Sequence, residues 1–187
     1  KDIHNDLSAY LDAANAKMVS EELEDGESGF TVTKANGKHV ITVNSLESLQ
    51  RRRFTICHEI AHIELGLPSS HQEVPSWSYA KRHVNEVMCD VVAAELLMPY
   101  MQWRALVPKK EPSLEVIEYM AAEFRTSFPA AASRYANLAD TPCAYVTMER
   151  GQVRYAARST PLRKVGAWIP PKSPIPPDSV AHRLREA

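Results

Sequence analysis

The segment His58-Glu59-Ile60-Ala61-His62 constrains this chain more than any other, because its spacing has chemical use only on an α-helix. Helical residues four apart lie one turn apart on the same face, so both imidazoles can bind one metal ion. Glu59, beside the first histidine, can then accept a proton from a water molecule. The pattern predicts a zinc site with His58 and His62 as ligands and Glu59 as the catalytic base. An amphipathic helix with two surface histidines is the alternative interpretation.

A catalytic zinc site also needs a third protein ligand and an open fourth position. Glu86 is the better candidate, and Asp90 lies one turn further along the same predicted helix, on the same face. Glu95 falls elsewhere on that helix and is the weaker candidate. Cys57 adjoins His58 and projects roughly 100° away around the helix, which disfavours it as a ligand. We expect one Zn²⁺ per chain, although Mn or Fe also accepts nitrogen and oxygen ligands.

Short β-rich runs precede the motif. Asn36-Gly37, a strong hairpin signal, stands between Phe30–Thr33 and His39–Val43. These runs predict two antiparallel strands, and Lys17–Glu22 is a candidate for a third. Either strand of the hairpin could be the edge that binds a substrate in extended form by strand addition.

Capping signals mark the helices. Asn44, with Glu47 three residues later, predicts the start of a helix that runs from about Leu46 to Leu65 and ends at Gly66. The remaining predicted elements are helices at Asn5–Ala16, Tyr79–Met98 and Ser113–Phe124, a short helix ending at Leu138, a hairpin of Cys143–Met148 with Gln152–Ala156, and an extended tail at Ile169–Asp178.

Composition narrows the class of protein. The net charge is −1, so no global positive field attracts nucleic acid or anionic membrane. No stretch is apolar for long enough to cross a bilayer. Three cysteines without CxxC spacing argue against a disulfide framework and suit a reducing compartment. We therefore expect a cytoplasmic protein without a membrane partner.

Two linked motifs resemble the ImmA/IrrE family of bacterial metallopeptidases. They are Arg53-Phe54-Thr55-Ile56-Cys57-His58-Glu59-Ile60-Ala61-His62 and Glu86-x-x-Cys89-Asp90-x-x-Ala93-Ala94-Glu95-Leu96-Leu97-Met98-Pro99. The likeness extends to about Leu138. It implies a gluzincin arrangement, in which Glu86 completes the metal site and Asp90 hydrogen-bonds a ligating imidazole.

The same resemblance implies an α+β fold. Residues 1–107 would form a minimal zincin-like core, with a short antiparallel sheet packed on the helix that carries the two histidines. Residues 108–140 would form a helix-turn-helix-like helical lobe, and residues 141–187 a β-hairpin with a proline-rich segment.

The resemblance further implies a zinc metalloendopeptidase that cleaves a helix-turn-helix repressor and so derepresses genes. A DNA-binding regulator built on Ser113–Leu138 is the alternative. Its second helix offers only Arg134 and Asn137 to DNA, so nucleic acid is not the expected partner. An inactive relative that only binds its partner is a third reading. The sequence leaves the oligomeric state open.

No residue is assigned to stabilise the tetrahedral intermediate. The nearest polar candidates are His71, Tyr79 and His83, but for each of them a loop or surface position is the favoured interpretation.

Overall fold

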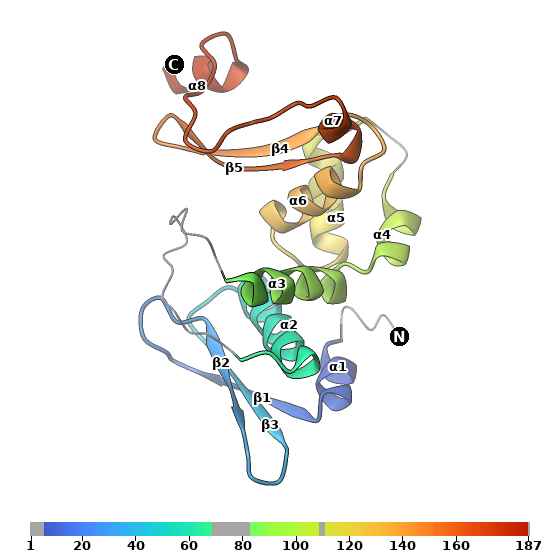
Figure 1. Cartoon of the computed structure of the whole chain (residues 1–187), viewed down its shortest axis with the longest axis vertical. Helices are drawn as coiled ribbons and strands as arrows, with labels where there is room; N and C mark the ends of the chain where they lie inside the picture. The colour runs from blue at the N-terminus through green and yellow to red at the C-terminus, as the bar shows by residue number, and fades with distance from the viewer. Residues whose placement is uncertain (1–5, 69–82, 109–110, 187) are drawn as a thin grey trace. The chain divides into compact units, whose positions relative to one another are not determined.

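The computed structural model describes residues 6–68, 83–108 and 111–186 (Figure 1). The chain divides into two compact units, Lys1–Phe128 and Pro129–Ala187. The boundary between them falls inside 108–140, and the division at residues 107 and 140 stays a prediction. No helix of the described ranges is both long and apolar enough to cross a membrane.

The first unit contains a three-stranded sheet of β1 (Ala16–Glu21), β2 (Gly29–Thr33) and β3 (His39–Asn44). The strand order is β1-β3-β2, and β2 and β3 form the expected antiparallel hairpin. Gly37 in its turn has a φ of 74°, which glycine adopts without steric cost. The α+β class is confirmed.

The third strand makes the sheet mixed rather than wholly antiparallel. The link after β1 carries the chain to the far edge, where β2 forms, and the hairpin then inserts β3 between them. As a result β3 runs parallel to β1. Because β3 is central, β2 is the hairpin strand that stands at an edge of the sheet formed by the described residues.

Helix α2 (Leu49–Leu65) carries the motif and begins later than predicted. Asn44 is not its N-cap, because β3 continues through Asn44, whose side chain instead accepts a hydrogen bond from the Leu46 amide. The Ser48 hydroxyl caps the helix by accepting from the Arg51 amide, and the helix ends at Gly66 as predicted.

The sheet, α2 and α3 (Val84–Leu97) form successive layers, since α2 packs against β2 and β3 and also against α3 (Figure 1). The other helices of this unit are α1 (Ser8–Ala13), α4 (Tyr100–Leu106) and α5 (Leu114–Glu123). Of these, α4 was not predicted; it starts just after Pro99, which occupies its N-cap. Buried side chains of the core include Ile41, Val43, Ile56, Cys57, Ile60, Ala61, Cys89, Ala93 and Leu97.

The second unit contains helix α6 (Phe128–Leu138), whose first residue is the last residue of the first unit. It also contains an antiparallel hairpin of β4 (Ala144–Glu149) and β5 (Gln152–Arg158). The hairpin was predicted, whereas α7 (Thr160–Lys164) and α8 (Val180–Glu186) were not. The proline-rich tail carries no helix and lies along β5, where the Val153 amide donates to the Ser173 carbonyl and the Lys172 amide to the Val153 carbonyl.

Candidate metal centre

Two adjacent helices supply the polar side chains of this site. His58 and His62 lie one turn apart on α2, with their ring centroids 4.9 Å apart. Glu86 projects from the first turn of α3, which packs against α2. The structure therefore brings together all three residues that the sequence analysis proposed as ligands.

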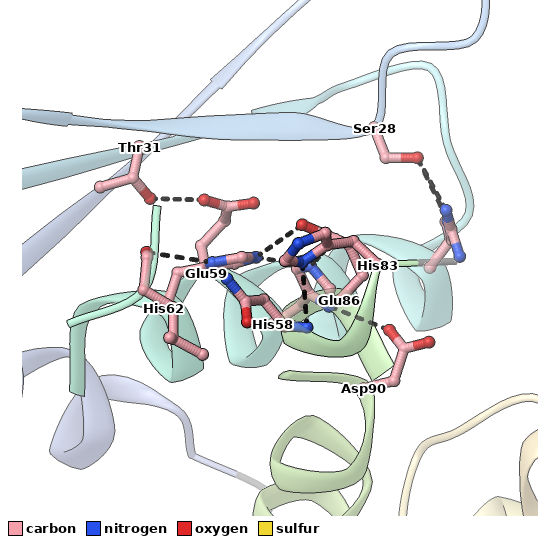
Figure 2. Close-up of polar contacts among 11 residues, drawn as sticks. Ser28, Thr31, His58, Glu59, His62, His83, Glu86 and Asp90 are labelled. Atoms are coloured by element: carbon pink, nitrogen blue, oxygen red, sulfur yellow. Dashed lines mark hydrogen bonds and ion pairs between the residues drawn. The ribbon is translucent and has the colours of Figure 1, made fainter. Parts of the chain in front are cut away.

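The ligand atoms of these residues converge on one point (Figure 2). The His58 Nε2 atom lies 3.1 Å from His62 Nε2 and 3.1 Å from Glu86 Oε2, and His62 Nε2 lies 3.5 Å from Glu86 Oε1. Four tetrahedral ligands at zinc-like bond lengths of about 2.0–2.1 Å stand roughly 3.3 Å apart. The spacing of the two imidazole nitrogens is close to this value, and each nitrogen lies near one oxygen of the Glu86 carboxylate. With one ligand atom from each residue, all three lie within 4.8 Å of one another, so this group could hold a metal ion.

The second nitrogen of each ring is already engaged. His58 Nδ1 donates to Asp90 Oδ1 at 3.0 Å, and His62 Nδ1 donates to the Leu67 carbonyl at 3.3 Å. This assignment of protons follows from the acceptors, which can only receive them. With the proton on Nδ1, each ring can present its Nε2 lone pair toward Glu86, as a metal ligand must.

The electrostatic environment of His58 favours positive charge. Burial lowers the pKa of His58, but the hydrogen bond to Asp90 and the negative charges of Asp90, Glu59 and Glu86 outweigh burial, and the pKa is raised above its ordinary value. The same carboxylates would stabilise a bound cation. Glu86 is 17% exposed, so the group is not sealed from solvent.

The cysteines are not part of this group. Cys57 and Cys89 are both fully buried, and burial raises the pKa of their thiols to about 12 and about 11. Burial thus disfavours the thiolate form, and neither thiol belongs to the group of converging ligand atoms.

Glu59 is 3% exposed and projects toward the sheet, where the Thr31 hydroxyl donates to Glu59 Oε2 at 2.7 Å (Figure 2). The sequence analysis did not identify Thr31. No spacing rule could have found it, because the contact joins a strand and a helix whose separation is set by tertiary packing.

Other residues considered from the sequence lie elsewhere. The Glu95 carboxylate accepts a hydrogen bond from the Tyr100 amide at 2.7 Å and is outside the convergent group. His83 caps α3 by accepting from the Asn85 amide. His71 and Tyr79 fall outside the described residues.

The chain was compared with curated proteins and with solved structures. No protein with a curated description matches it. A solved structure of a Mycobacterium tuberculosis transcriptional regulator has a similar fold, with a TM-score of 0.58 and 17% identity. The match covers 99% of this chain but 56% of that one, and at this identity it shows the fold alone.

Family membership follows from the sequence itself. The Peptidase_M78 family, described as the IrrE N-terminal-like domain, matches residues 12–135. This match covers more than half of the chain, includes every residue of the convergent group and confirms the ImmA/IrrE resemblance. The chain belongs to the IrrE N-terminal-like family of metallopeptidases.

Proposed function

We propose that this chain is a cytoplasmic zinc metalloendopeptidase whose substrate is a protein. The observation that carries the proposal is the convergence of the His58 and His62 imidazoles with the Glu86 carboxylate. The buried Glu59 carboxylate lies on α2, the helix that carries both histidines. Two nitrogen ligands and one oxygen ligand suit zinc and leave a fourth position free.

Each residue has a distinct task in this proposal. His58, His62 and Glu86 hold the metal, and Asp90 orients His58. Bound zinc supplies a Lewis acid for the scissile carbonyl and lowers the pKa of water. Glu59 accepts a proton from the attacking water and passes it to the leaving amine.

The edge strand β2 supports binding of an extended polypeptide. Among the described residues β2 stands at one end of the strand order, and Thr31 of this strand contacts Glu59 directly. A substrate segment added alongside β2 would place a peptide bond near the proposed base. We propose a helix-turn-helix repressor as the substrate, on the basis of the family resemblance. Its cleavage would derepress genes, including genes of a stress response.

DNA itself is the weaker candidate partner. The chain has a net charge of −1, and Asn137, the exposed amide of α6, already accepts a hydrogen bond from Arg163. A DNA reader needs exposed polar side chains and basic neighbours for phosphate contact.

The proposal is tested with purified protein and the repressor encoded nearest to its gene. Elemental analysis should find about one zinc per chain, and the double variant His58→Ala, His62→Ala should lose it. Glu59→Gln should keep zinc and abolish cleavage, because an amide cannot accept the proton. Glu64→Gln, an equal change of charge at an exposed site on α2, should cleave normally.

Two results would refute the assignment. Repressor cleavage that persists in Glu59→Gln would exclude this residue as the base. Duplex DNA affinity that survives physiological salt, together with no cleavage, would favour the regulator instead.

A further inference from the structure

A buried carboxylate needs a partner, and the partner of Glu59 comes from the sheet. The Glu59 side chain is 3% exposed. The Thr31 hydroxyl donates to its Oε2 atom at 2.7 Å. A lone buried carboxylate would pay a desolvation penalty and tend to change its conformation, so this hydrogen bond decides where the carboxylate lies.

Contacts between β2 and α2 repeat at nearly equal distances along the strand and along the helix. Gly29 faces Thr55, and two residues along the strand Thr31 faces Glu59, four residues along the helix. Two strand residues advance about 6.6–6.8 Å and four helical residues about 6 Å, so both contacts can form together.

Gly29 allows the close approach that this match requires. A Cβ atom there would lie 2.7 Å from Thr55 Cγ2 and closer still to the Thr42 carbonyl oxygen. Any larger residue would force β2 to shift against the Thr42 carbonyl of β3 and against Thr55 of α2. The missing side chain at Gly29 therefore keeps the Thr31 hydroxyl within hydrogen-bonding distance of Glu59.

We propose that Thr31 is a positioning residue for Glu59, an inference that rests on the proposed peptidase function. Its hydroxyl occupies Oε2 and leaves Oε1 to accept the proton of the attacking water. In Figure 2 one carboxylate oxygen points at Thr31 and the other away from it. Because threonine is β-branched, its χ1 is stiff and holds the hydroxyl in place.

Three variants separate positioning from a general effect on the fold. Thr31→Val removes the hydroxyl but keeps nearly the same side-chain shape, whereas Thr31→Ser keeps the hydroxyl and removes the methyl group. Thr33→Val makes the same chemical change two residues along the same strand, where the hydroxyl instead contacts His39. Circular dichroism and zinc content establish that each variant is folded and loaded.

The first readout is the conformation of Glu59 in crystal structures of the zinc-loaded proteins. We expect one conformer of Glu59 in the wild type, Thr31→Ser and Thr33→Val. In Thr31→Val the carboxylate should be displaced or occupy several conformers. An unmoved carboxylate in Thr31→Val would overturn the proposal, whether or not the protein is a peptidase.

The second readout uses a quenched fluorescent peptide that the wild-type protein has selected from a library. Thr31→Val should lower kcat roughly 10–100-fold, because a misplaced base transfers the proton poorly. The KM should change less than about twofold, and Thr31→Ser should recover most of the rate. Unchanged kcat in Thr31→Val beside an inactive Glu59→Gln overturns the positioning role alone. Full activity in both variants overturns the peptidase mechanism and this role with it.

Discussion

His58 and His62 are held by different kinds of group. His58 donates to a carboxylate on another helix, Asp90 of α3, whereas His62 donates to the Leu67 carbonyl just beyond the end of its own helix. The orientation of His58 consequently depends on how α2 packs against α3. A carboxylate partner also makes an imidazole a stronger electron donor than a carbonyl partner does.

Asp90→Asn should weaken zinc binding about 10–100-fold. The amide oxygen can still accept the hydrogen bond from His58, but the negative charge that strengthens this ligand is lost. Competition with a chromophoric chelator measures the affinity. Glu95→Gln is the matched control, since it removes one charge from an exposed position of the same helix and should leave the affinity unchanged. Equal losses in both variants would mean that only net charge matters.

The contact between β2 and α2 links the sheet to the catalytic side chain. A three-stranded sheet would be possible with many spacings between sheet and helix, but here a Cβ atom at Gly29 would clash with Thr55 of α2 as well as with the Thr42 carbonyl of β3. Substitution of Gly29 should therefore lower both stability and activity, whereas substitution of a glycine in a turn should lower stability alone.

Gly29→Ala and Gly37→Ala form an informative pair. The first forces backbone movement at the β2–α2 contact and should cost about 1–3 kcal/mol of unfolding free energy. The second places alanine at a φ of 74° and should cost about 1–2 kcal/mol. Urea denaturation measures both. Only Gly29→Ala should also lower kcat, because it moves Thr31 away from Glu59; equal kcat values in the two variants would contradict the argument.

The candidate metal site lies wholly within the first unit, Lys1–Phe128, and joins two helices of that unit. A ligand that binds only the folded chain raises its stability by mass action. Because the three donors come together only when α2 and α3 pack, the unfolded chain offers no equivalent site. Metal binding and folding of this unit should therefore be coupled.

Zinc should raise the Tm of the wild-type protein. Free zinc at 100 times its Kd adds about 2.7 kcal/mol, which corresponds to roughly 5–10 °C for a chain of this size. Calorimetry with and without zinc measures the shift. Magnesium, which prefers oxygen ligands, should leave Tm unchanged. A zinc-dependent rise that persists in the His58→Ala, His62→Ala double variant would place the binding site elsewhere.

Local spacing in the sequence was enough to predict several features. The four-residue interval put His58 and His62 on one helical face, and the same interval put Glu86 and Asp90 on another. Asn36-Gly37 predicted the hairpin between β2 and β3. Each of these features depends on backbone geometry within one or two turns of chain, which neighbouring residues determine.

Only the tertiary structure decided which distant groups meet. It placed Glu86 rather than Glu95 beside the imidazoles, and it brought Thr31 to Glu59. It also inserted β3 between β1 and β2, which left β2 as the edge beside the site. These pairings depend on how whole helices and strands pack, and that packing is the sum of many weak contacts that no short motif encodes.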